Sequence, residues 1–209
     1  MKTFNKTLIA AATLTTFGLA AAPAAVALDA SASIATSYLW RGTELGNGDA
    51  ALAVDLSGST GAVSYGLWVS SGDQETGAGT DDHEGGTEYD IYASYGGSVG
   101  EIGYSVGYAS YNYPSRSVGF DDAAEYVYGL SYGPASVTVF DGKGTDYEYT
   151  VVGYEAGAFS FAYGDEDDGA GAERTHFDVS YAVNDSLTLT VSDPENADSI
   201  VVASYTLPF

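Results

Sequence analysis

The sequence predicts an all-β chain that closes into an antiparallel transmembrane β-barrel of about twelve strands. Three observations indicate this: apolar and polar residues alternate, connections sort into short and long, and the chain ends in an aromatic residue, Phe209. A period of two is that of a strand, whose successive side chains point to opposite faces. After residue 28 no apolar run approaches spanning length. A membrane role therefore requires a barrel, because lipid tolerates only helices and closed sheets.

Residues 1–27 have the features of a cleaved secretory signal peptide, which leaves 28–209 as the barrel domain. Lys2 and Lys6 precede an apolar stretch, and Ala25-Val26-Ala27 forms an A-x-A cleavage site. That order is typical of an export signal. A permanent membrane anchor is disfavoured, because the apolar stretch is interrupted by threonines and is shorter than the roughly 20 residues a spanning helix needs.

Charge and composition exclude several classes of function. The chain carries 29 acidic and 6 basic residues, for a net charge of −23, and loss of the leader removes two of the basic residues and no acid. Nucleic acid is therefore not an expected partner, since it would be repelled. The absence of cysteine rules out disulfides and thiolate metal sites, and no cofactor or metal site is expected. The 18 tyrosines and 27 glycines suit strands and tight turns.

Alternation is clear in the segment 123–132. Tyr126, Tyr128 and Leu130 share one face, while Glu125 and Ser131 share the other. Segmenting the chain at turn residues gives strands of roughly the length that a tilted transmembrane strand requires. The predicted strands are 31–42, 50–57, 62–71, 87–96, 101–113, 123–132, 135–141, 146–155, 158–164, 175–183, 186–192 and 199–209.

The connections alternate in length along the chain. Short ones fall at 58–61, 97–100, 133–134, 156–157 and 184–185, and the others at 43–49, 72–86, 114–122, 142–145, 165–174 and 193–198, of which only 142–145 is tight. Short periplasmic turns and longer extracellular loops are the outer-membrane pattern. The acidic long loops do not match the EF-hand spacing; they are either solvated charge or divalent-ion bridges to surface lipopolysaccharide.

The last strand carries an alternating apolar face that ends at the terminus. Tyr205, Leu207 and Phe209 lie on this face after Val201 and Ala203. This ending resembles the C-terminal signal that outer-membrane barrels present to the barrel-assembly machinery. It predicts that machinery as a partner, together with outer-membrane lipids and lipopolysaccharide, and predicts the cell outer membrane as the location.

An ordered series of short motifs resembles the TorF family of porins, over about residues 34–209. The matching motifs are Tyr38-Leu39-Trp40-Arg41-Gly42, Gly66-Leu67-Trp68-Val69-Ser70, Glu88-Tyr89-Asp90-Ile91-Tyr92, Tyr111-Asn112-Tyr113-Pro114 and Glu125-Tyr126. The segment Asp49-Ala50-Ala51-Leu52-Ala53 departs from the family pattern, because it lacks the Pro and Gln-Gly expected after the first loop. The resemblance implies a small outer-membrane porin.

Charged residues in the strands are expected on the phase that faces the lumen, because a charge at the lipid-facing midplane costs about 2–4 kcal/mol. The predicted lumen set is Arg41, Asp55, Glu88, Asp90, Glu125, Glu148, His176 and Asp178. Small inward residues lie between them, and twelve strands enclose more space than eight. Six carboxylates against one arginine predict a channel for small solutes or ions that prefers cations.

Two alternatives remain open. Arg41 pairing with Glu88, Asp90 or Glu125 would plug the lumen and make a non-conducting structural barrel. The inward aromatic residues are expected to pack or to form a girdle rather than a sugar-stacking track. An outer-membrane enzyme is the less favoured alternative, since only His83 and His176 are available, and same-face residues on one strand are too far apart to form a triad. We expect no enzyme.

Overall fold

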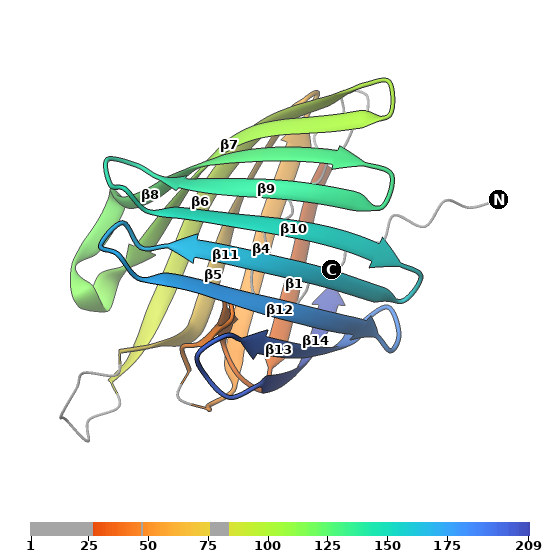
Figure 1. Cartoon of the computed structure of the whole chain (residues 1–209). Coiled ribbons are helices and arrows are strands. Elements are labelled where there is room, and N and C mark those ends of the chain that lie inside the picture. The colour runs from red at the N-terminus through yellow and green to blue at the C-terminus, as the bar shows by residue number, and fades with distance from the viewer. Residues whose placement is uncertain (1–26, 47, 76–83) are drawn as a thin grey trace.

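The computed structural model describes residues 27–46, 48–75 and 84–209. Twelve of its strands form one closed antiparallel barrel (Figure 1), which confirms the predicted fold class. The barrel strands are β1 (Ala27–Ala35), β4 (Ala51–Thr60), β5 (Val63–Glu75), β6 (Glu84–Val99), β7 (Ile102–Tyr113), β8 (Val118–Tyr132), β9 (Ala135–Gly142), β10 (Glu148–Ala156), β11 (Phe159–Asp167), β12 (Glu173–Ala182), β13 (Leu187–Pro194) and β14 (Ile200–Pro208). Two further strands, β2 (Leu39–Trp40) and β3 (Thr43–Glu44), form a separate hairpin, and η1 (Pro114–Arg116) is a 3-10 turn.

Each barrel strand pairs with its neighbours in the sequence, and the last strand closes the ring on the first. Ser31 of β1 lies opposite Pro208 of β14, and Ala35 lies opposite Ser204. Closure leaves no unpaired strand edge. A sheet in lipid requires this, because an open edge would expose unbonded backbone groups. Among the described residues, no helix has the length and apolar character of a membrane span.

The short connections all lie at one end of the barrel. Gly61, Gly100, Gly133 and Gly157 each adopt a left-handed conformation there, in four of the five turns. In the fifth turn the side chain of Asn184 accepts hydrogen bonds from the backbone N–H groups of Ser186 and Leu187, each at 2.9 Å. The described parts of the remaining connections lie at the opposite end, so the sorting of turns and loops predicted from the sequence is present.

The outer surface of the barrel is apolar. Along β8, Tyr126, Leu130 and Tyr132 are exposed, with fractions of 42% to 61%. Leu56, Ile91 and other large apolar side chains are exposed around the rest of the ring. A surface this apolar is unfavourable in water and is what a barrel presents to lipid.

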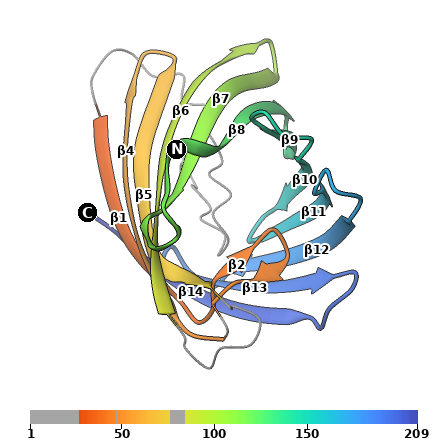
Figure 2. The same cartoon turned by 90° about the vertical axis from the view of Figure 1, so that its left-hand side faces the viewer.

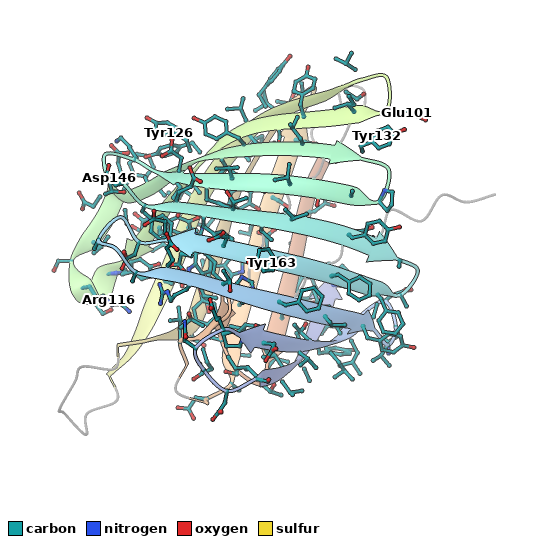
Figure 3. The ribbon with its side chains drawn as sticks, in the orientation of Figure 1. Glu101, Arg116, Tyr126, Tyr132, Asp146 and Tyr163 are labelled. Atoms are coloured by element: carbon teal, nitrogen blue, oxygen red, sulfur yellow. The ribbon has the colours of Figure 1, made fainter. Side chains whose placement is uncertain are left out.

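Aromatic side chains gather near the short turns on the outer face. Tyr132 lies at this end, and its hydroxyl donates to Glu101 at 3.2 Å; Figure 3 shows the two together, with Arg116 and Asp146 at the far end. The exposed aromatic residues near these turns are Tyr65, Tyr95, Tyr132, Tyr154, Phe159, Tyr181, Tyr205 and Phe209. Such a ring is typical of a membrane interface.

Two predicted boundaries differ from the structure in ways that matter for the site. The predicted strand 31–42 ends at Ala35, because residues 37–45 leave the wall. The predicted loop 114–122 is shorter, since β8 begins at Val118 and pairs there with Tyr113 across a register shift. The predicted leader lies outside the described residues, apart from Ala27, where β1 begins.

Candidate pore constriction and outer mouth

The hairpin β2–β3 folds into the barrel from the end opposite the short turns. Figure 2 views the barrel from that end and shows the hairpin inside the ring of strands. Its two-residue turn is Arg41-Gly42, with φ angles of 46° and 77°. Two positive φ values are typical of the turns that join tight hairpins. Tyr38, Leu39 and Arg41 are buried, so the tip of the hairpin is enclosed by the strands around it.

Arg41 is held by an ion pair with Glu125 of β8. Its Nη1 and Nη2 donate to Oε1 and Oε2 of Glu125 at 2.8 and 2.7 Å. Both side chains are more than nine-tenths buried. The bidentate geometry matches the planar guanidinium to the carboxylate and is the strong form of this interaction. The pair ties the hairpin to a strand 84 residues further along the chain.

Aromatic rings surround the same guanidinium. The Cζ of Arg41 lies 4.5 to 4.6 Å from the ring centroids of Trp40, Phe140 and Tyr149. The Tyr147 hydroxyl accepts a second bond from Nη1, and the Tyr111 hydroxyl accepts from Nη2 at 3.4 Å. Cation–π contacts of a desolvated arginine contribute roughly 2 kcal/mol or more. The surroundings of Arg41 therefore satisfy a charge that would otherwise be costly to bury.

A second set of bonds fixes the first arm of the hairpin. The Tyr38 hydroxyl donates to Oε2 of Glu88 at 2.6 Å, and the Tyr113 hydroxyl donates to Oε1 at 2.9 Å. Tyr38 also packs on Trp68, with ring centroids 6.0 Å apart. The carboxylate of Glu88 thus bridges the hairpin to β7 through two phenols.

The third contact is steric and involves Gly42. A Cβ built on Gly42 would lie 2.5 Å from the Cβ of His176 on β12. His176 is itself fixed, because Nδ1 lies 3.0 Å from Oδ1 of Asp178 and Nε2 lies 2.9 Å from the Tyr149 hydroxyl. Glycine is thus required here for close approach as well as for its positive φ.

Most of the predicted lumen residues lie on the inner face. Glu88, Glu125 and His176 surround the hairpin as described, and Asp178 bonds His176. Asp55 accepts a bond from the Tyr92 hydroxyl at 2.8 Å. Asp90 is 6% exposed, and its Oδ1 has no hydrogen-bond partner among the described residues.

Glu148 is the exception and corrects the prediction. It is exposed, on the same phase of β10 as the exposed residues Val152 and Tyr154. The inward phase of β10 is Tyr149 and Val151, both of which are fully buried. Glu148 is the first residue of the strand, next to the tight loop 143–147, so its charge faces water beyond the apolar band.

Tyr205, Leu207 and Phe209 lie on the outer face of the barrel, with exposed fractions of 44%, 47% and 81%. That placement agrees with the alternating face read from the sequence.

The rings around Arg41 are not predicted by the sequence analysis. Phe140, Tyr147 and Tyr149 come from β9, the following loop and β10. They meet Arg41 only because residues 37–45 turn into the lumen, which a strand over 31–42 would not do. The available clue was the alternation of β10, which places Tyr149 on the inward phase and Glu148 on the outward phase.

Toward the short turns the inner face carries mostly small side chains. A Cβ built on Gly129 would clash with the hydroxyl of Ser105, and a Cβ built on Gly153 would clash with the hydroxyl of Ser136. Ser131 pairs with Ser136 in the same inward row. The lumen is therefore crowded at the level of the hairpin and lined by small residues below it.

A cavity of about 420 Å³ opens on the outer side of the hairpin. Its walls come from Trp40 and Arg41 of the hairpin turn and from the outer ends of β7 and β8, with the loop 143–147 and parts of β11 and β12. The constriction at Arg41 thus forms the floor of an outer mouth.

Among the described residues, His176 bonds no serine or threonine hydroxyl. Its partners are Asp178 and Tyr149, whereas Ser180 bonds the hydroxyl of Thr190 at 2.8 Å. A serine hydrolase would need its serine within hydrogen-bond reach of the histidine. His83 lies outside the described residues. The arrangement favours a structural role for His176, as a support for the hairpin turn.

No protein-family model and no curated protein matches the chain, so the resemblance to the TorF family stays a prediction from its motifs. Among solved structures, the chain is similar to the KdgM porin, with a TM-score of 0.47 and 9% identity over 87% of this chain and 97% of that one. Mutant forms of the Rh. blastica porin give a TM-score of 0.39 and 18% identity, over 76% of this chain and 55% of theirs.

Proposed function

We propose that this chain is an outer-membrane, porin-type channel for small solutes, narrowed on its extracellular side by the hairpin β2–β3. The proposal rests on the contrast between two levels of the same lumen. Bonded aromatic and charged groups crowd the level of Arg41, while small residues line the face below it. The apolar outer surface supports a place in lipid.

The orientation follows from the two ends of the barrel. The short turns and the C-terminal strand would face the periplasm, and the hairpin would enter from outside, as in outer-membrane barrels generally. Export by the leader and insertion through the C-terminal face of Tyr205, Leu207 and Phe209 belong to the same proposal. Lipids and lipopolysaccharide would then be its neighbours.

A preference for cations is part of the proposal. Glu125 is neutralised by Arg41, but Asp55, Glu88 and Asp178 also lie on the inner face. Fixed negative charge inside low-dielectric walls raises the local concentration of cations. The exposed residue Glu148 lies outside this field and should have little influence on selectivity.

A non-conducting structural barrel is the second candidate, and one observation favours it. Nη1 and Nη2 of Arg41 are each bonded to two acceptors, so the hairpin is tightly held in place. The two candidates differ in a single measurable property, ion conductance.

The test is a planar bilayer recording of the purified full-length mature barrel under a salt gradient. The proposal predicts discrete conductance steps and a reversal potential that indicates cations. Asp55→Asn should move the reversal potential toward zero, whereas the matched variant Glu148→Gln should leave it unchanged. Absence of steps at every voltage would reject the channel, and equal effects of the two variants would reject the assigned selectivity.

A further inference from the structure

The outer mouth combines ring faces and hydrogen-bonding groups in one cavity. Trp40, Tyr111, Tyr113 and Tyr147 contribute aromatic surface to a volume of about 420 Å³. Cavities of roughly 300–1,000 Å³ with apolar walls and a few placed polar groups are the usual form of small-ligand sites. The mouth therefore has both the size and the surface of a binding site.

The charges that line this cavity balance. Arg41, Lys143 and Arg174 supply three positive charges, and Asp122, Glu125 and Glu166 supply three negative ones. This balance contrasts with the net charge of −23 on the whole chain. A ligand with a net charge would gain no net attraction from such a lining, so the cavity suits a neutral polar ligand.

The charges are also arranged as pairs. Nη2 of Arg174 lies 2.6 Å from Oε1 of Glu166, and Arg174 remains 52% exposed at its side chain. Lys143 bonds Asp121 and is 36% exposed. A hydroxyl group donates one hydrogen bond and accepts others. A cationic side chain paired with a carboxylate can therefore donate to a ligand hydroxyl and accept from it.

We infer that the outer mouth binds a neutral saccharide of one or two rings. Sugar hydroxyls would bond the paired side chains of Arg174 and Glu166, and the apolar face of a sugar ring would pack on the aromatic walls near Trp40. The inference takes from the proposed function only the assignment of this end to the outside. It does not require the barrel to conduct.

The chain offers its own reporter for this site. It contains two tryptophans; Trp40 lines the cavity, whereas Trp68 is 8% exposed and packs on Tyr38. In the full-length mature barrel in detergent, Trp68→Phe leaves Trp40 as the single tryptophan, so that tryptophan emission, excited apart from that of tyrosine, reports on this site alone. Titration with maltose and with sucrose should give a saturable change in its emission, and sodium gluconate should not.

Two controls locate the response. The paired change Glu166→Gln with Arg174→Gln keeps the balance of charge and should weaken maltose binding at least tenfold. Asp165→Asn, a change at an exposed neighbour outside the cavity, should leave it unaltered. Heat-dependent gel mobility would verify that each variant remains a closed barrel.

Absence of a saturable response to both sugars in a folded Trp68→Phe barrel would overturn the inference. So would a stronger response to gluconate, or an affinity unchanged by the paired substitution. A barrel that binds maltose but shows no conductance would retain this site and lose the proposed channel, so the two failures are distinguishable.

Discussion

Arg41 and Glu125 lie 84 residues apart in the chain and form a bidentate ion pair inside the barrel, with N–O distances of 2.7 and 2.8 Å. Arg41 stands at the tip of the hairpin β2–β3 and Glu125 in the wall. The pair therefore ties the hairpin to the wall inside the lumen.

The first prediction concerns this pair. Arg41→Met or Glu125→Gln leaves one buried charge without its partner, which costs about 3–5 kcal/mol in the docked state. Each variant should release the hairpin and shift the emission of Trp40 to longer wavelength, measured with Trp68→Phe as background. The double variant should be no worse than either single one, because the two changes remove the same interaction.

An additive double variant would contradict the coupling of Arg41 and Glu125. Arg116→Gln is the matched control, since Arg116 lies in the outer turn η1 and stacks on Tyr113 at 4.9 Å. It should leave Trp40 emission unchanged.

The second prediction concerns the two faces of the wall. Leu130 is 55% exposed on the outer face, and its neighbour Ser131 is on the inner face. Leu130→Lys should lower the free energy of unfolding in lipid vesicles, by less than the roughly 2–4 kcal/mol expected at the bilayer midplane, because Tyr132 of the interfacial ring is only two residues away. Ser131→Lys should cost much less. Urea titration in vesicles measures both, and equal losses would refute a lipid-facing outer surface.

The third prediction concerns the loop between β11 and β12. Oδ1 of Asp168 accepts hydrogen bonds from the N–H groups of Ala170 and Ala172, at 2.8 and 3.0 Å. These bonds hold the pKa of Asp168 below the ordinary value for an aspartate. Because the native pKa is lowered, the carboxylate stabilises the loop above the ordinary pKa of about 3.9, and this contribution is lost as pH falls through the lowered native value.

Amide chemical shifts of Ala170 and Ala172 should therefore stay constant until the pH is well below about 4. In Asp168→Asn the same shifts should no longer follow the carboxyl titration. A transition at the ordinary aspartate pKa in the unmodified barrel would contradict these bonds.

Much of the wall was predictable from local pattern, whereas the constriction was not. The alternation of Tyr126, Tyr128 and Leu130 identifies β8 and its lipid-facing side, because the period of a strand is a property of its backbone. Closure into twelve strands follows from the number of such segments and the sorting of their connections.

The hairpin could not be predicted because its residues have the alternating pattern of a strand. Tyr38-Leu39-Trp40 continues the segment that starts at residue 31. Arginine rarely adopts a positive φ, so the sequence gives no sign of a turn at Arg41. The turn forms because β8, β9, the following loop and β10 offer Arg41 a carboxylate and three aromatic rings, contacts that lie far along the chain. The outward position of Glu148 follows from simple alternation, because Glu148 shares the phase of Val152 and Tyr154.

Gly42 gives the most direct test of the constriction, because a change there leaves every charge in place. Gly42→Ala would place a Cβ 2.5 Å from the Cβ of His176, whereas Gly144→Ala, at a nearly equal φ of 74°, meets no atom within 4 Å. Single-channel conductance in planar bilayers should rise above that of the unmodified barrel in Gly42→Ala and stay unchanged in Gly144→Ala. Equal conductance in all three would contradict a bore limited by the docked hairpin.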